Sequence, residues 1–356
     1  MSAVLSARPF GVSPLRAVAV AVLIAALFLV PPLYGQFLPQ RMSDYLIFGL
    51  PALAVGLIAG HARLLNIGVG ATFGVAAYAV AILSNHGVLN PVVLMLAALA
   101  AGVVVSILFA IYAVVATGLE YLLLTLLTTA AFAALPLLFT GLTGGENGLA
   151  VKGVVDISFG LDPLVGNGFY WLLCVVTVFW CALSSYLLSS RAGRVMVAIG
   201  RNPVRAAAMG YSVHAYQVAV TLYSGVMAAS GGWLYALAHA FVFQEQLGLT
   251  SSINAVLYSL IGGVDTIIGP LLGTIGLRFL GEYLGTQTTQ TQLYIGVALL
   301  IVVYLLPAGV VGGVRQLWLL RDVIRRRGVP EEEEPLTSAL AREAGFDTLL
   351  GGATDE

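Results

Sequence analysis

One apolar stretch decides the class of this fold: residues 91–117 read PVVLMLAALAAGVVVSILFAIYAVVAT. The stretch contains no charged residue, and it exceeds the roughly 20 residues that an α-helix needs to cross the hydrocarbon core of a bilayer. Inside a bilayer every backbone N–H and C=O must find its partner within the protein, and a helix provides these partners along its own length. We therefore expect a transmembrane helix at this position.

The composition extends this interpretation to the rest of the chain. Of 356 residues, 59% are apolar and only 9% are charged, and the mean hydropathy is +0.97. A soluble domain usually carries about 25% charged residues, so this chain lacks the charge that would keep a water-facing surface solvated. The sequence predicts an all-α integral membrane protein, a polytopic bundle of about ten transmembrane helices in the inner (plasma) membrane.

Stretches of similar length and apolarity recur on both sides of residues 91–117. The first of them follows two arginines but lacks a small-residue cleavage site, so we expect it to be retained as a span rather than removed as a signal peptide. Two pairs, 43–60 with 64–84 and 251–267 with 268–285, are short and could contain broken or re-entrant helices. The expected spans are 16–33, 43–60, 64–84, 91–117, 121–140, 169–188, 214–238, 251–267, 268–285 and 293–311.

Positively charged loops set the expected orientation, because they stay on the cytoplasmic side. The loop 189–213 carries four arginines and no acid, so it should be cytoplasmic. The loop 141–168 carries Lys152 against three acids, which suits the outer side. With this set of spans both termini fall in the cytoplasm. The expected parts are a cytoplasmic N-terminal segment 1–15, a transmembrane domain 16–314 and a cytoplasmic tail 315–356.

The charge of the chain is divided unevenly between the membrane domain and the tail. After Pro330, eight acids stand against Arg342 alone, out of 17 acids and 16 bases in the whole chain. The part before Pro330 therefore holds nine acids against fifteen bases. We expect the tail to be basic at its start and acidic beyond, and to remain outside the bilayer.

Two glycine-rich interruptions fall in the two short pairs of spans. Residues 60–70 read GHARLLNIGVG, and residues 261–270 read IGGVDTIIGP. Transporters built from two related halves often place broken helices at such matching positions, around the solute pathway. The alternative is two tight turns between ordinary helices. On the first interpretation the candidate pathway residues are Asn66, Gly68, Gly70, Gly262, Gly263, Asp265, Gly269 and Pro270.

The motifs of the common catalytic and metal sites are missing. The sequence has no phosphate-binding G-x-x-x-x-G-K-[ST] motif, no H-E-x-x-H and no paired Cys/His set, so no enzyme activity, cofactor, metal ion or nucleic-acid binding is expected. Arg278 and Glu282 are four residues apart on one expected helix and could pair with each other. The four histidines, His61, His86, His214 and His239, all fall near the ends of expected spans.

The basic loop 189–213 is the most informative segment. It predicts a short helix from Pro203 to Met209, because Asn202 suits the N-cap, Pro203 the first helical position and Gly210 the stop. Such a helix, with exposed arginines and alanines, suits docking to a soluble partner; the alternative is an ordinary positive-inside loop. The candidate docking residues are Arg191, Arg194, Arg201, Asn202, Pro203, Arg205, Ala206, Ala207 and Gly210.

At this loop the chain resembles a family: the permease subunits of branched-chain amino acid ABC importers, of the LivM type. The family's coupling segment has the form S-x-x-G-R-x-x-x-A-I-R-x-N-x-x-A-A-x-x-x-G. The chain departs from the family at Val204 and Arg205, where an acid is frequent, at Val69, where a histidine is common, and at Asp265, which replaces a glycine. The matching positions are Gly193-Arg194, Ala198-Ile199, Asn202, Ala206-Ala207 and Gly210, and four further stretches agree in order at 64–83, 142–149, 228–238 and 261–273.

The resemblance implies one half of the pathway of an ATP-driven importer. It implies as partners two ABC ATPase subunits in the cytoplasm, a second permease subunit, a periplasmic solute-binding protein and membrane lipid. The helix at Pro203–Gly210 would sit in a groove of the ATPase and transmit its closure. The segments 141–150 and 239–250 would face the binding protein. Branched-chain amino acids or a related small polar solute would be the cargo.

Two other classes of protein stay open from the residues alone. A stand-alone secondary carrier or channel would work without an ATPase and would depend on Asp265, Arg278 or Glu282. An integral-membrane enzyme or scaffold would need a clustered site at one interface, and the sequence offers none. Co-purification of an ATPase subunit distinguishes the importer from both.

Overall fold

A computed structural model describes residues 37–152, 168–287 and a few positions between 293 and 312. Several expected parts lie outside the described residues: the span 16–33, most of the span 293–311 and both terminal segments. The long helices are α2 (Phe37–His61), α3 (Val69–Asn85), α4 (Pro91–Val115), α5 (Leu119–Leu138), α7 (Gly168–Ser189), α10 (Val213–His239), α11 (Leu249–Gly262) and α12 (Gly269–Gln287). The short elements are α6 (Thr140–Thr143), η1 (Gly145–Asn147), β1 (Leu149–Ala150), α8 (Arg191–Arg201), α9 (Pro203–Ala208), β2 (Phe241–Val242) and η2 (Gln244–Leu247).

The predicted class, an all-α bundle of apolar helices, is confirmed. In the part of the chain that the structure describes, four helices are long and apolar enough by themselves to cross a membrane: α2 from Pro39 onward, α4, α5 and α7. Helices α3 and α11 are apolar but shorter, at 17 and 14 residues. Helices α10 and α12 have the length but contain more polar residues.

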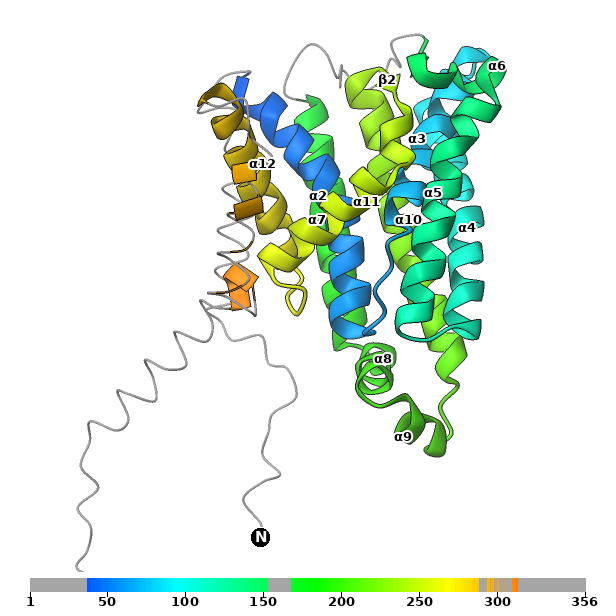
Figure 1. Ribbon diagram of the computed structural model, residues 1–356, viewed down its shortest axis with the longest axis vertical. Helices are drawn as coiled ribbons and strands as arrows, with labels where there is room; N and C mark the ends of the chain where they lie inside the picture. The colour runs from blue at the N-terminus through cyan, green and yellow to red at the C-terminus, as the bar shows by residue number, and fades with distance from the viewer. Residues whose placement is uncertain are drawn as a thin grey trace, which may run out of the picture. The chain divides into compact units, whose positions relative to one another are not determined.

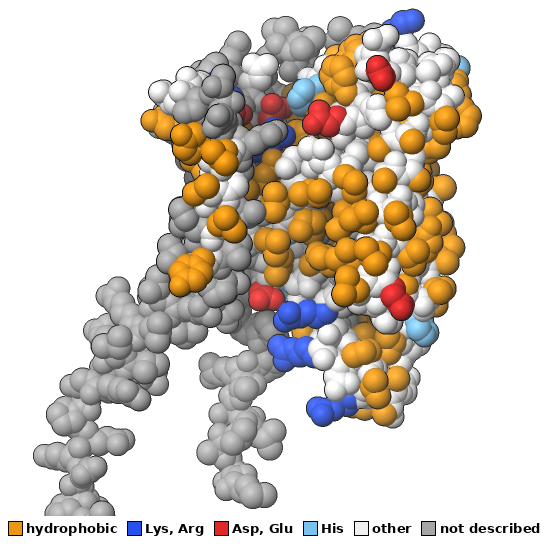
Figure 2. Space-filling model, in the orientation of Figure 1, with side chains coloured by type: hydrophobic (Ala, Val, Ile, Leu, Met, Phe, Trp, Pro, Cys, Tyr) orange, Lys and Arg blue, Asp and Glu red, His pale blue; other side chains and the backbone are white. Residues whose placement is uncertain are grey.

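Helix α10 lies at the centre of the bundle, packed against α2, α3 and α4, while α12 packs against α2 and α11 (Figure 1). The core is built from small and large apolar side chains of these helices, with Leu50, Phe73 and Leu234 fully shielded. Apolar side chains that remain exposed cover the outside of α4, α5 and α7, as a lipid-facing surface requires. Figure 2 shows such orange patches over much of the visible face.

The first glycine-rich interruption is a broken span. Helix α2 ends at His61, residues 62–68 run without helical structure, and α3 begins only at Val69, inside the bundle (Figure 1). The expectation of helix over 64–68 is therefore wrong. Two threonines of α5 pair with backbone groups freed there: Thr125 accepts from the Ile67 N–H at 3.3 Å, and Thr129 donates to the Ile67 carbonyl at 3.2 Å.

The second interruption is a tight turn between two ordinary helices, which is the alternative to a broken helix. Helix α11 ends at Gly262 and α12 begins at Gly269, which shortens the expected spans 251–267 and 268–285 by a few residues at the junction. Gly263 adopts φ +105, a conformation that a side chain would strain. The Thr266 hydroxyl donates to the Gly263 carbonyl at 3.0 Å and accepts from the Gly269 N–H at 3.1 Å. Asp265 is exposed on this turn, as expected.

The short elements gather at two opposite ends of the bundle (Figure 1). Helices α8 and α9 lie at one end, where α2 and α4 finish and α5 and α10 begin. At the other end α6 lies beside a two-stranded antiparallel ladder, in which Leu149 of β1 pairs with Val242 of β2. We refer to them as the α8 end and the β1 end.

Candidate functional site

Helix α8 is an element that the sequence analysis missed. It covers Arg191–Arg201, where only a loop was expected before residue 203. Ser190 caps it by accepting a hydrogen bond from the Gly193 N–H at 3.1 Å. Its buried face carries Met196 and Ile199, and its arginines point outward. The signal was available: Ser190 is a favoured N-cap, and Met196 and Ile199 are spaced as one face of a helix.

Helix α9 confirms the predicted short helix, ending one residue earlier than expected, at Ala208. Asn202 is the N-cap and accepts from the Arg205 N–H at 2.9 Å. Gly210, at φ +87, follows the helix end as expected. Ala206 is buried at 1% exposure, whereas Val204 is 78% and Met209 60% exposed. Of the predicted docking residues, the exposed ones are Arg191, Arg194, Arg201, Asn202, Pro203, Arg205, Ala207 and Gly210.

Helix α8 is anchored to the bundle by close packing against α2. A Cβ atom on Gly200 would lie 2.6 Å from the His61 carbonyl oxygen and 3.1 Å from that of Ala62, so only glycine allows this approach. Met196 is buried in one apolar cluster with Leu57 and Val220. A movement of α8 must therefore displace the end of α2 or open this cluster.

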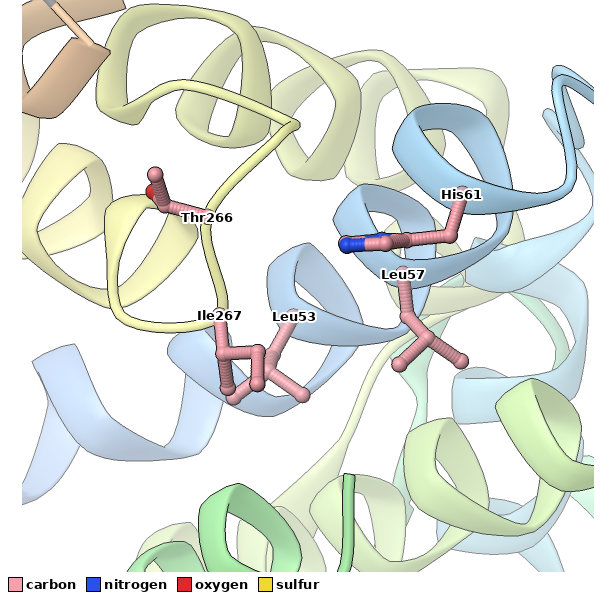
Figure 3. Close-up of a pocket in the computed structure, with 5 residues that line it drawn as sticks. All are labelled: Leu53, Leu57, His61, Thr266 and Ile267. Carbon is pink, nitrogen blue, oxygen red and sulfur yellow. The ribbon is translucent and has the colours of Figure 1, made fainter. Parts of the chain in front are cut away.

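The same end of α2 packs against the turn between α11 and α12. A Cβ atom on Gly60 would overlap the Val264 carbonyl, so the helix and the turn touch through backbone atoms. Beside this contact a narrow gap is lined by Leu53, Leu57, His61, Thr266 and Ile267 (Figure 3). In the close-up the His61 ring points from α2 toward the turn. The chain thus forms a continuous contact from α8 through α2 to the turn.

The predicted pathway residues fall in two places. Around the broken span, Asn66 is buried and accepts from the Gly68 N–H at 2.7 Å, while the Gly70 N–H donates to Ser252 of α11 at 3.0 Å. At the turn, Gly262, Gly263 and Asp265 precede α12, and Gly269 and Pro270 open it. The structure brings the start of the first interruption, at Gly60 and His61, against the second. It leaves Asn66, Gly68 and Gly70 deeper in the bundle, beside α5 and α11.

A polar cluster near the β1 end was not predicted from the sequence. Arg41 of α2 forms an ion pair with Glu282 of α12 at 3.1 Å, and Asp44 of α2 lies 3.3 Å from His239 of α10. The expected pairing of Arg278 with Glu282 is therefore replaced by a pair between helices. Arg278 instead lies over the ring of Phe48, 3.6 Å from its centroid. No local signal links these residues, because they come from three helices far apart in the chain.

The histidines lie at helix ends, as expected. His61 ends α2, His86 follows α3, and His214 and His239 lie at the two ends of α10. Where side chains are described, no group of three or more His, Cys, Asp and Glu residues is placed to hold a metal ion.

The fold and the two ends agree with a family match over most of the chain. Residues 40–306 match the family described as branched-chain amino acid transport system, permease component. The chain belongs to this family. The matched range begins in α2 and includes both glycine-rich interruptions, α8 and α9.

Two relatives of the permease are named for the import of other solutes. It is 29% identical over 272 residues, 76% of each chain, to the autoinducer 2 import system permease protein LsrC of Enterobacter sp. (strain 638). It is 31% identical over 154 residues to the fructose import permease protein FrcC of Rhizobium meliloti, which is 41% of this chain and 43% of that protein. No solved structure matches the chain. The relatives are import permeases, so the permease is a transport component and not an enzyme; they do not support the finer LivM-type assignment.

Proposed function

We propose that the permease is the membrane subunit of an ATP-driven ABC importer for a small polar solute, and that it forms half of the translocation pathway. The observation that carries the proposal is the contact from α8 through α2 to the α11–α12 turn. If an ATPase subunit is to move the transmembrane helices, a continuous and stiff connection must transmit its movement to them. The family match and the import permeases among its relatives support the same function.

The α8 end is proposed as the docking surface for the ATPase subunits. Helix α9 presents exposed apolar side chains, Val204 and Met209, beside exposed Arg201 and Arg205. Apolar anchors surrounded by charged groups are typical of the centre and rim of a protein interface. The arginines also favour a cytoplasmic location for this end by the positive-inside rule, so we propose that the β1 end lies outside.

The β1 end is proposed as the docking surface for a periplasmic solute-binding protein. The segments 141–150 and 239–250, far apart in the chain, are joined there by the β1–β2 ladder. Asn85 at the end of α3 braces the ladder by donating to the Ala150 carbonyl at 2.7 Å. The second permease subunit, a different chain or a second copy, would complete the pathway alongside lipid-facing helices.

Two cargo classes follow from the matches. The family description names branched-chain amino acids, whereas the two relatives are named for fructose and for autoinducer 2. We propose a hydroxylated solute as the cargo, because one of the two relatives is named for the import of fructose, a sugar. A branched-chain amino acid is the competing outcome.

A pull-down tests the coupling role. The tagged permease, expressed with its neighbouring transport genes, is purified in mild detergent as wild type and as Arg201→Glu with Arg205→Glu. We expect an ATPase subunit to co-purify with the wild type and to be lost from the double variant. The matched control is Arg63→Glu, because Arg63 is also an exposed arginine near the α8 end but lies outside α8 and α9.

Two results would count against the proposal. If no ATPase co-purifies with the wild type under conditions that keep other ABC complexes intact, the ATP-driven mechanism is wrong, and the chain should be tested alone in liposomes as a secondary carrier or channel. If the ATPase binds equally to the wild type and the double variant, the docking surface lies elsewhere.

A further inference from the structure

The polar cluster near the β1 end lies at membrane depth. An α-helix rises 1.5 Å per residue, so Phe48 and Asp44 lie about 20 and 25 Å along α2 from His61. The hydrocarbon core of a bilayer is about 30 Å thick. With the α8 end of α2 at one boundary, Arg278 over Phe48 lies inside the core, and Arg41 with Glu282 lies near the opposite boundary. Charged side chains at such depth face the protein interior or an aqueous path.

The cluster is open rather than sealed. Between 33% and 43% of the side chains of Arg41, Glu282, His239 and Asp44 is exposed. Near the upper end of Figure 2 charged side chains and a histidine gather between the regions of α12 and β2. A path for polar solutes needs groups that are reachable and yet lie within the bilayer, and this cluster meets both conditions.

Aromatic rings pack directly against the polar side chains of the cluster. His239 stacks on Tyr235 with centroids 4.2 Å apart, and Tyr235 meets Phe48 edge-on at 5.7 Å. Phe48 in turn lies beneath the Arg278 guanidinium. The Nε atom of Arg278 is buried and has no hydrogen-bond acceptor among the described residues. A buried donor without an acceptor is costly and is relieved by any ligand that brings an oxygen.

The cluster holds two carboxylates, Asp44 and Glu282, and two guanidinium groups, Arg41 and Arg278. Arg41 is paired with Glu282 and Asp44 with His239, and the charges of Arg278 and Glu282 both act on Asp44. A charged or zwitterionic solute would have to displace one of these partners. A neutral solute with several hydroxyl groups would instead donate to the carboxylates and accept from the guanidinium groups while the pairs persist.

We propose that Asp44, His239, Arg278 and Glu282, above the rings of Phe48 and Tyr235, form a solute-binding station in the outer half of the pathway, and that it takes neutral polyhydroxylated solutes. The inference rests on the proposed function, because a station is useful only in a transport path. It goes further by naming the residues that contact the cargo and the chemistry that selects it.

Labelling of introduced cysteines tests the location. Asp44→Cys and Glu282→Cys are made separately, with Cys174 and Cys181 replaced by alanine, in the complete complex reconstituted in liposomes. We expect a membrane-impermeant thiol reagent added on the binding-protein side to modify both positions and to stop uptake. The matched control is Phe279→Cys, one turn from Glu282 on α12 and 57% exposed on the apolar side, where slow labelling without loss of uptake is expected.

Protection by solute tests the cargo class. The probes are D-fructose, D-ribose, D-mannitol, L-leucine and L-isoleucine, each given with the binding protein and ATP. We expect a hydroxylated probe that the wild-type complex accumulates to slow labelling at position 44 or 282 at least fivefold, with no change at position 279. The two positions provide independent tests should one variant fail to assemble.

Each other outcome has a distinct meaning. Protection by leucine or isoleucine would overturn the assigned solute class. If no probe that the complex accumulates slows the labelling, the proposed binding site is wrong, and the ion pairs serve only to hold the helices together. If the wild-type complex accumulates none of the probes in the presence of ATP, the proposed function itself fails, and this is read from uptake before any labelling is done.

Discussion

At the scale of single residues, the packing of this permease depends on positions where a backbone approaches another backbone. Gly60 meets the α11–α12 turn and Gly200 meets the end of α2, both without room for a Cβ atom. Threonine hydroxyls pair with the N–H and C=O of Ile67 in the non-helical segment 62–68. The sequence shows these residues as ordinary glycines and threonines, and only their neighbours give them their roles.

Gly60→Ala should destabilise the protein, because the new Cβ would overlap the Val264 carbonyl and force apart α2 and the turn. Overpacking of this kind costs about 1–3 kcal/mol, partly offset by the better helix propensity of alanine. Thermal unfolding in detergent, followed by tryptophan fluorescence, measures the change. Gly276→Ala is the control, because nothing lies within 4 Å of a Cβ at that position. Equal midpoints for both variants would show that the contact is not tight.

Replacing both Thr125 and Thr129 with valine should also destabilise the bundle. The Ile67 N–H and C=O would lose the partners that the buried threonines provide, at about 1–3 kcal/mol for each group left unpaired. The same unfolding experiment measures the loss. Thr274→Val is the control, because its hydroxyl bonds a carbonyl of its own helix, that of Pro270. A double variant as stable as this control would contradict the pairing.

At the scale of elements, α2 is interrupted by a proline and α9 is very short. Pro51 lies inside α2, between the polar cluster and the contacts with α8. Proline has no N–H, so the helical hydrogen bond to the Ile47 carbonyl is missing there. The two working halves of α2 are therefore separated by its weakest turn. Helix α9 has only six residues, so its own hydrogen bonds give it little stability and its caps matter most.

Asn202→Ala should unfold α9 locally, because it removes the acceptor for the Arg205 N–H. Loss of such a cap costs about 0.5–2 kcal/mol. Hydrogen exchange of the amides at 203–208 should become faster, and less ATPase should co-purify. Ser212→Ala is a matched control: Ser212 occupies the N-cap position of α10 but its side chain makes no capping hydrogen bond. Unchanged exchange in Asn202→Ala would mean that packing of Ala206 alone holds α9.

At the scale of the whole molecule, the working parts occupy the two ends of one bundle, and α2 connects them. Its first turns carry Arg41 and Asp44, and its last residues touch both α8 and the α11–α12 turn. A conformational change at the α8 end therefore has a direct mechanical route to the polar cluster. On the proposed function, the α8 end faces the ATPase and the β1 end faces the binding protein.

The orientation can be checked with cysteines at the two ends, in the background without native cysteines. A cysteine replacing Glu146 in η1 should react with an impermeant reagent in intact cells, whereas one replacing Arg205 in α9 should react only after permeabilisation. Glu120→Cys, at the start of α5 on the α8 end, should behave as the Arg205 variant does. Labelling of positions 146 and 205 from the same side would overturn the assignment of the two ends.

The membrane class, the approximate spans among the described residues and a short helix starting at Pro203 could all be predicted from the sequence. These are local properties: apolar length decides whether a segment can cross a bilayer, and Asn202, Pro203 and Gly210 supply start and stop signals within a few residues. The same reasoning could have found α8, since Ser190 and the spacing of Met196 and Ile199 carry that information.

The conformations of the two interruptions and the partners of the charged residues could not be predicted from the sequence, because they depend on tertiary contacts. Two similar glycine-rich sequences became a broken span and a tight turn, because Thr125, Thr129 and Ser252 were present to pair the backbone of the first. Glu282 paired with Arg41 rather than with Arg278, four residues away, because α2 lies against α12. Such choices depend on partners that lie 58 or more residues away in the chain, and no local pattern encodes them.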